Sequence, residues 1–306
     1  MKNLNVEEKF KIVVIVGAIF FLAYMSLFQA RGNPKIRNTA TISDSELALE
    51  EAVIPPNGAA LPIRWGDLGY QMVKTGVIDA GKFKKLYTIN GELDAETEKL
   101  LSATDNENIK ITSRNSRLIL NLLWALGLGN KNEILEKGPM ITYSGAGSPA
   151  EALAKAGGFA STGGWTLAVG SAMDHYSKHL FIALTPEQQK LVELVSQNIY
   201  RLCCGDSTYF PDCNHGMAML GLLELMASQG VSEEEMYKAA LAVNSYWFPD
   251  TYLTIAKYLE EKKNIDWEDA DPKEILGANY SSASGYQRIL KEISPPVNNQ
   301  SGSCGI

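Results

Sequence analysis

Apolar side chains recur with the period of an α-helix through most of this 306-residue chain, and this pattern constrains the fold more than any other feature. The clearest case is residues 113–128, where one broad apolar face is formed by Leu118, Leu120, Leu122, Leu123 and Leu126. Gly127 and Gly129 follow this face and are typical of a helix end. We therefore expect a long buried helix in this segment.

The same period predicts helices along the rest of the chain, at 65–74, 79–87, 95–103, from 149 onward, and at 165–184, 186–203, 214–228, 232–246, 249–261 and 283–293. Only residues 140–144 resemble a short strand, and there is no series of alternating strands and no internal repeat. The sequence therefore predicts an all-α fold, a helical bundle.

Residues 165–184 are predicted to form the most apolar helix after the N-terminal region. A helix that is apolar around most of its circumference is usually central and buried. His175 and His179 lie four residues apart in it, so they are expected to share one helical face. Glu224, inside the apolar run 217–227, has two interpretations: a buried acid near the site or, more simply, a helix face that reaches solvent, and we expect the second.

A nearly uninterrupted apolar run covers residues 12–28 and, with its flanks, is long enough to cross a bilayer as a helix. A cleaved secretory signal is the alternative, but Phe28 is too large for the position three residues before a cleavage site. We expect residues 12–30 to be a single-pass membrane anchor. The main domain is then extracytoplasmic, and the membrane is a partner of the chain through this helix.

The remaining boundaries follow from composition. Residues 31–60 are polar, lack periodicity and end in a Pro-Pro-Asn-Gly turn, which predicts a flexible tether. We expect a short N-terminal tail at 1–11, an α-helical domain at 61–293 with a possible small lobe at 61–140 and a main bundle at 141–293, and a disordered tail at 294–306.

Charge and glycine spacing exclude two classes of ligand from the prediction. The formal net charge is -7 and no basic block is present, whereas a nucleic-acid partner requires a basic face. Residues 145–150 match G-x-G-x-x-A before a helix, but the second strand of a dinucleotide site is missing from the pattern. We therefore expect neither a nucleic-acid partner nor a nucleotide cofactor, and nothing in the sequence identifies a protein partner.

The side chains that bind soft metals gather in one stretch, which contains all three histidines and three of the four cysteines: His175, His179, Cys203, Cys204, Cys213 and His215. The cysteines flank a predicted helix–loop–helix turn, so an antiparallel hairpin brings them together. The motif around His175 is DHYSKH and lacks the glutamate of a metalloprotease helix. The pattern favours a site for zinc or copper, and these six residues are its candidate ligands.

Two alternatives remain open for the same cysteines. In an oxidising compartment, Cys203 or Cys204 would pair with Cys213 and staple a structural or interaction domain that has no catalytic activity. Alternatively, Cys203 and Cys204 act as the thiols of an oxidoreductase. The sequence does not decide whether the protein is an enzyme, and Cys304 in the tail is expected to be unrelated to the cluster.

Overall fold

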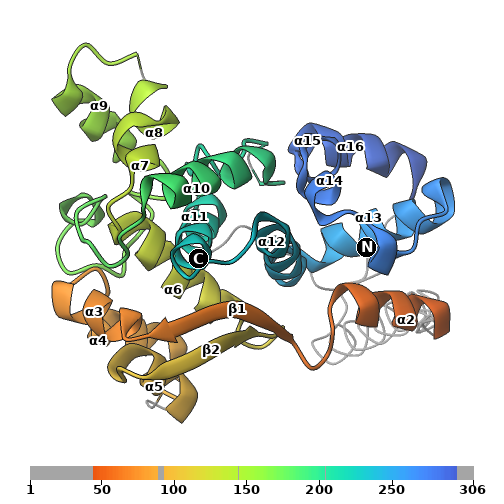
Figure 1. Ribbon diagram of the computed structural model, residues 1–306, viewed down its shortest axis with the longest axis horizontal. Helices are drawn as coiled ribbons and strands as arrows, with labels where there is room; N and C mark the ends of the chain where they lie inside the picture. The colour runs from red at the N-terminus through yellow and green to blue at the C-terminus, as the bar shows by residue number, and fades with distance from the viewer. Residues whose placement is uncertain (1–43, 89–92, 144, 204, 295–306) are drawn as a thin grey trace, which may run out of the picture. The chain divides into compact units, whose positions relative to one another are not determined.

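The computed structural model describes residues 44–88, 93–143, 145–203 and 205–294. The chain divides into two compact units, Met1–Leu47 and Ala48–Ile306, and the account that follows concerns the second. Its N-terminal half begins within α2 (Asp44–Val53) and contains β1 (Ala59–Gly66), α3 (Leu68–Thr75), α4 (Ala80–Tyr87), α5 (Ala95–Ser102), β2 (Asn106–Ile111), α6 (Ser116–Gly129), α7 (Glu133–Lys137), α8 (Pro139–Thr142) and α9 (Pro149–Ala156) (Figure 1). Helix α2 thus lies inside the range predicted to be a tether.

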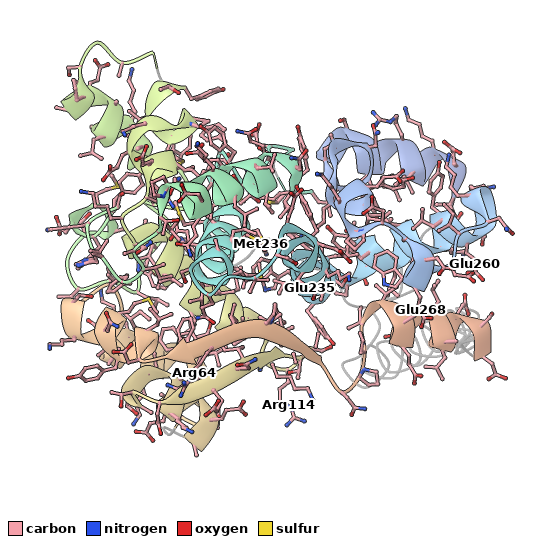
Figure 2. The ribbon with its side chains drawn as sticks, viewed as in Figure 1. Arg64, Arg114, Glu235, Met236, Glu260 and Glu268 are labelled. Carbon is pink, nitrogen blue, oxygen red and sulfur yellow. The ribbon has the colours of Figure 1, made fainter. Side chains whose placement is uncertain are left out.

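In the C-terminal half, every regular element among the described residues is a helix. This half contains α10 (Pro186–Asn198), α11 (Asn214–Ser228), α12 (Glu233–Trp247), α13 (Pro249–Tyr258), α14 (Pro272–Leu276), α15 (Ala278–Ser281) and α16 (Ala283–Glu292), with a π-helical turn at Leu259–Lys263 and short 3-10 turns at Ala172–Asp174 and Trp267–Asp269. Helix α12 has one buried face and one exposed face: Met236 is fully buried in the core, while the adjacent Glu235 is exposed (Figure 2).

The prediction of an all-α fold is wrong, because β1 and β2 pair as a two-stranded antiparallel sheet (Figure 1). Leu61, Ile63 and Trp65 alternate along β1 and are each 1% exposed, which is the period of a half-buried strand. The alternation is short, and its last member, Trp65, was assigned to a helix that in fact begins at Leu68. The predicted strand at 140–144 is also wrong, since α8 ends at Thr142 and Ser144 lies outside the described residues.

The free edge of β1 meets a side chain instead of a third strand. The Gln229 side chain accepts a hydrogen bond from the Arg64 backbone N–H through Oε1 and donates one to the Arg64 carbonyl through Nε2, each at 2.8 Å. One amide side chain therefore satisfies both backbone groups of Arg64, as the backbone of a paired strand would.

Helices α6 and α11 form the centre of the core. Every residue of α6 from Leu118 to Gly129 is buried, as is every residue of α11 from His215 to Ala227. The two backbones touch where Gly127 and Gly221 meet, because a Cβ on Gly221 would lie 2.7 Å from the Gly127 nitrogen. Glycine is therefore required at this crossing.

The predicted helix at 165–184 is not formed. Its described backbone is irregular, with a positive φ at Gly170 (75°) and Ser177 (49°) and a single 3-10 turn at Ala172–Asp174. Other segments satisfy its polar groups: the Val169 N–H donates to the Gly76 carbonyl and the Ser177 N–H donates to the Leu128 carbonyl. The segment is a partly buried loop, in which Trp165 and Tyr176 pack into the core while Leu180 is exposed. An apolar run can therefore also belong to a loop that packs against neighbouring elements.

No helix among the described residues combines the length and apolar character needed to cross a membrane. The longest of them, α11 and α12, have 15 residues each, or about 22 Å against the ~30 Å of a bilayer's hydrocarbon core. This finding overturns our prediction of a single-pass membrane protein with an extracytoplasmic main domain. Residues 12–30, on which the anchor was predicted, lie outside the described residues, as do 1–11 and 295–306.

Glu224 is fully buried in the middle of α11, contrary to the expectation that it reaches solvent. Its Oε2 accepts a 2.7 Å hydrogen bond from the Asn130 side chain. Burial raises the pKa of Glu224 well above its usual value, although the hydrogen bond from Asn130 lowers it in part. The carboxyl is thus held in its neutral form over a wider pH range than an exposed glutamate.

We expect Gly221→Ala to destabilise the protein by roughly 2 kcal/mol, because the added methyl group would push α6 and α11 apart. Denaturant unfolding of the full chain measures this loss. Gly147→Ala is the matched control, since its Cβ would meet nothing closer than a glutamate oxygen at 3.5 Å. Equal stabilities of the two variants would contradict the close approach of the helices.

We expect Glu224→Gln to flatten the dependence of folding stability on pH. Below the ordinary glutamate pKa of 4.5 both states of the wild type are protonated, but as pH rises only the unfolded chain ionises, so stability falls. The fall is at most ~1.4 kcal/mol per pH unit for one group. As pH rises above 4.5, the free energy of unfolding should fall less in the variant than in the wild type. Identical dependence of this free energy on pH would show that Glu224 is charged in the folded protein.

Candidate functional site

The loop between α10 and α11 folds back on itself and brings distant cysteines together. Helix α10 ends at Asn198, and an isolated antiparallel bridge then joins Tyr200 to Ser207. The Thr208 N–H donates to the Ile199 carbonyl at 2.8 Å, and Gly205 has a φ of 83°. The returning chain enters α11 at Cys213, so Cys203 and Cys213 lie at the two sides of one loop.

The guanidinium of Arg201 holds this loop together from inside. The side chain is only 2% exposed. Its nitrogens donate to the carbonyl oxygens of Asp206 (3.2 Å), Ser207 (3.0 Å) and Phe210 (2.6 Å), to the Asp212 carboxylate (3.0 Å) and to the Cys213 sulfur (2.9 Å). A rigid, planar group with several donors suits this task, and a lysine could not replace these bonds.

Gly216 makes room for this guanidinium in the first turn of α11. A Cβ at Gly216 would overlap the Arg201 Nη1 atom, and it would lie 2.7 Å from Cζ. The backbone of α11 is therefore in direct contact with the buried cation. Gly216 and Arg201 form a matched pair, neither of which was recognised from the sequence.

Cys213 is the N-cap residue of α11, and its sulfur accepts a hydrogen bond from the Gly216 N–H at 3.4 Å. The same sulfur is the acceptor of the Arg201 Nη1 donor at 2.9 Å. Both the guanidinium and the positive end of a helix stabilise negative charge on sulfur. The surroundings of Cys213 thus favour the thiolate, which is the form that binds metals.

Three of the predicted ligands come together at this point. The ligand atoms of Cys203, Cys213 and His215 all lie within 4.8 Å of one another, and these three residues are exposed, half-buried and buried respectively. The two sulfurs are 3.3 Å apart, farther than the ~2.05 Å of a disulfide bond and close to the ~3.8 Å between two sulfurs on one tetrahedral zinc ion. The prediction of a group that can hold a metal ion is confirmed for these residues.

Aromatic side chains fix the orientation of His215. Its ring centroid is 4.4 Å from that of Phe248 and 5.6 Å from that of Trp247. Both aromatic residues lie at the C-terminal end of α12, and they cover the inner side of the site. The imidazole is therefore 7% exposed and lies in an apolar wall, where its position is fixed by packing.

Acidic groups outnumber basic ones around the sulfurs. Burial raises the pKa of Asp206, and the negative charges of Asp212 and Cys213 raise it further, while the Arg201 charge lowers it. Arg201 already forms an ion pair with Asp212 at 3.0 Å. A single buried guanidinium therefore compensates a larger amount of negative charge, and this favours the binding of an added cation.

Of the other predicted ligands, His175 and His179 are not part of this group. Cys204 lies outside the described residues. His179 forms a bridge with Asn130, whose side chain bonds Glu224, and Glu224 lies nine residues beyond His215 on α11. Nine residues correspond to roughly 13 Å of helix. The pair of His175 and His179 is therefore remote from the sulfurs, and one ion cannot be held by both groups.

His175 and His179 nevertheless bond to each other. The Nδ1 atom of His175 is 3.1 Å from Nε2 of His179, and the other His175 nitrogen lies 2.9 Å from the Val169 carbonyl oxygen. Burial and the neighbouring His175 lower the pKa of His179. Their proximity was expected from a helical spacing, but the structure produces it through an irregular turn at Ser177.

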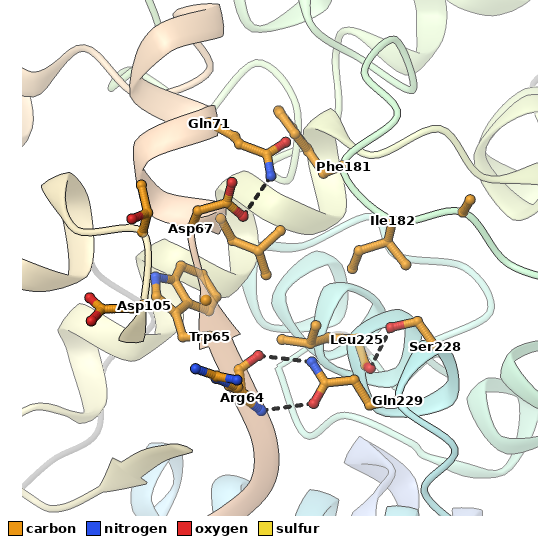
Figure 3. A pocket seen from close by; sticks show the side chains of 14 residues that line it. Arg64, Trp65, Asp67, Gln71, Asp105, Phe181, Ile182, Leu225, Ser228 and Gln229 are labelled. Atoms are coloured by element: carbon orange, nitrogen blue, oxygen red, sulfur yellow. Dashed lines mark hydrogen bonds between the residues drawn. The ribbon is translucent and has the colours of Figure 1, made fainter. Parts of the chain in front are cut away.

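A surface cleft of about 740 Å³ lies in another part of the fold (Figure 3). It is bounded by the end of β1 and the start of α3, by the segment that contains Phe181 and Ile182, and by the C-terminal end of α11. None of the six candidate ligands lines it. The cleft therefore does not form part of the Cys/His site.

Comparison with known proteins adds no assignment. No protein-family model, curated protein or solved structure matches this chain. The function of the site must accordingly be argued from its own geometry and charge.

We expect Arg201→Met to destabilise the protein by roughly 3–5 kcal/mol, because the loop carbonyls and the Asp212 carboxylate lose a buried charged donor. Urea unfolding of the full chain measures this change. Lys257→Met is the control, since its 3.8 Å pair with Glu261 is partly solvated and contributes little. A loss as small as that of the control would contradict the structural role of Arg201.

Proposed function

We propose that the protein binds one soft transition-metal ion, zinc or copper(I), through Cys203, Cys213 and His215. The observation that carries the proposal is the mutual distance of these three ligand atoms, none more than 4.8 Å from another. Two sulfurs and one imidazole form a ligand set that zinc and copper(I) both accept, whereas magnesium and calcium prefer oxygen.

The surroundings of the ligands support the same function. The Arg201 guanidinium and the Gly216 N–H both donate hydrogen bonds to the Cys213 sulfur. Hydrogen bonds from residues that are not themselves ligands commonly orient a metal-bound thiolate. The excess of carboxylates near the sulfurs compensates an incoming cation. Arg201 packs against Gly216 of α11 and donates to one lone pair of the Cys213 sulfur, which leaves another lone pair of that sulfur for the ion.

Cys204 decides what kind of metal site this is. Four protein ligands make a closed, structural zinc site, whereas three leave a position for water or substrate. Cys204 follows Cys203 directly and supplies a further sulfur in the sequence. If Cys204→Ser binds metal as tightly as the wild type, the site keeps an open position that is suited to delivery or catalysis.

The two alternative functions are now less favoured. A structural disulfide between Cys203 and Cys213 is less favoured because the two sulfurs are 3.3 Å apart, farther than the ~2.05 Å of a disulfide bond. The thiol oxidoreductase was expected to use Cys203 with Cys204, which lies outside the described residues, whereas the described partner of the Cys203 sulfur is Cys213 at 3.3 Å. Both alternatives are distinguished from metal binding by the experiment that follows.

We expect the reduced full-length protein to bind about one zinc or copper(I) ion per chain. Cys213→Ser should weaken binding by more than about 100-fold, because the loss of a ligand exceeds the usual effect of losing an outer hydrogen bond. Binding should also weaken as pH falls through about 6.5, where a typical histidine becomes protonated. Chelator competition with metal analysis of the purified chain measures each quantity.

The matched controls are His215→Ala and His179→Ala. Only the first should lower metal affinity, since only His215 lies with the sulfurs. If Cys213→Ser binds metal as well as the wild type does, the proposal fails. Mass spectrometry that finds Cys213 quantitatively bonded to another cysteine, with no metal bound, would instead identify a structural disulfide.

A further inference from the structure

We infer that Cys203 and Cys213 form a dithiol that hydrogen peroxide converts reversibly into a disulfide, and that this conversion releases the metal ion. The inference has two steps. The first, oxidation of the pair, depends on the geometry of the two sulfurs alone. The second, release of the ion, rests on the proposed metal-binding function.

The distance between the sulfurs permits direct bonding. They are 3.3 Å apart, so they need to approach by little more than an ångström to reach bonding distance. Cys203 precedes Gly205, whose φ of 83° places it in the region that glycine adopts easily, in the middle of the loop. Cys213, in contrast, is fixed at the start of α11.

The two cysteines differ in the way that a reactive and a resolving thiol differ. The Cys213 sulfur receives the Arg201 guanidinium at 2.9 Å and the Gly216 N–H at 3.4 Å, and both stabilise its thiolate. Cys203 is the exposed member of the pair. A thiolate is the form that peroxide attacks, so Cys213 is assigned as the nucleophile and Cys203 as the resolving cysteine.

The chemistry balances with hydrogen peroxide as the oxidant. The Cys213 thiolate attacks one peroxide oxygen, the O–O bond breaks, and Cys213 becomes a sulfenic acid as hydroxide leaves and takes up a proton to form water. The Cys203 thiolate then attacks the Cys213 sulfur, the S–O bond breaks, and the oxygen leaves as a second water with the proton lost by Cys203. Two sulfurs have been oxidised and one peroxide has been reduced.

The disulfide removes two of the three ligands in the described group. A disulfide sulfur has no negative charge and binds zinc or copper(I) poorly, and His215 alone does not retain the ion. Metal and oxidant therefore compete for the same pair of thiolates. A bound ion is expected to slow oxidation, and oxidation is expected to release the ion.

The first step is tested without metal, in the full chain with Cys204→Ser and Cys304→Ser. Because the sequence has four cysteines, only Cys203 and Cys213 remain. One equivalent of peroxide should remove two hydrogens from the intact mass and yield a Cys203–Cys213 linked peptide, and dithiothreitol should reverse both changes. Stable addition of oxygen to the sulfurs, covalent dimers, or no reaction would each overturn the first step.

The assignment of roles is tested by removing one thiol at a time from this background. Cys213 alone, with Cys203→Ser, should form a trappable sulfenic acid about tenfold faster than Cys203 alone, with Cys213→Ser. Arg201→Lys should slow the formation of sulfenic acid at Cys213 and leave that at Cys203 unchanged, since only the Cys213 sulfur accepts the 2.9 Å bond from Arg201. Equal rates for the two single cysteines would overturn the assignment of Cys213 as the nucleophile.

The second step uses the wild-type chain loaded with zinc. Peroxide should release zinc to a chromogenic chelator in proportion to the disulfide formed, and dithiothreitol should restore binding. If zinc binds and the disulfide forms but zinc stays bound, the switch is overturned and the metal function stands. If neither zinc nor copper(I) binds the reduced chain, the proposed function fails, and a disulfide found in the metal-free test still establishes the first step.

Discussion

The contact between the backbones of α6 and α11 is the constraint on which the described fold depends. Because neither Gly127 nor Gly221 has a side chain, the two most buried helices touch directly, and their apolar faces meet around that point. Helix α11 then organises three other features along its length. Its N-terminal end contributes Cys213 and His215 to the Cys/His cluster, its middle buries Glu224, and Gln229, directly after its last residue, bonds β1.

The arrangement of the cluster reflects a competition for negative charge. Arg201 and the start of α11 stabilise the Cys213 sulfur before any ion arrives, so the site is organised in advance of metal binding. Because the thiolate is already stabilised, the free energy of binding that a metal ion would obtain from that sulfur is smaller. The carboxylates of Asp206 and Asp212 offset this effect, because the guanidinium is shared among several acceptors. If the proposed ion binds, its affinity therefore depends on the balance of these charges as well as on the ligand count.

Sequence periodicity predicted the helices whose burial is amphipathic or complete, such as α6, α11 and α12, because their apolar spacing is long and regular. It failed at residues 165–184, where an apolar run forms a partly buried loop whose polar backbone groups bond other segments. It also failed at β1, where only three alternating side chains signal a strand. In these two cases the information lies in contacts between distant parts of the chain, which a local period does not contain.

The candidate site was predictable in part for a similar reason. The hairpin expected between two helices does bring Cys203 near Cys213 and His215. His175 and His179 were placed with them only because a buried helix was expected to face that hairpin, and this helix is not formed. Arg201 and Gly216 were missed, since an arginine two residues before a cysteine and a glycine in a helix carry no local signal of their mutual contact.

The pairing of Gln229 with Arg64 has a consequence for how copies of this chain meet one another. A two-stranded sheet with an unoccupied edge offers a row of donors and acceptors to any extended segment, and such edges promote aggregation. Here a side-chain amide occupies the donor and the acceptor of Arg64 from within the same molecule. A strand from another molecule would have to displace Gln229, at the end of α11, before it could pair with β1 at Arg64. The central helix therefore also hinders aggregation through this edge of the sheet.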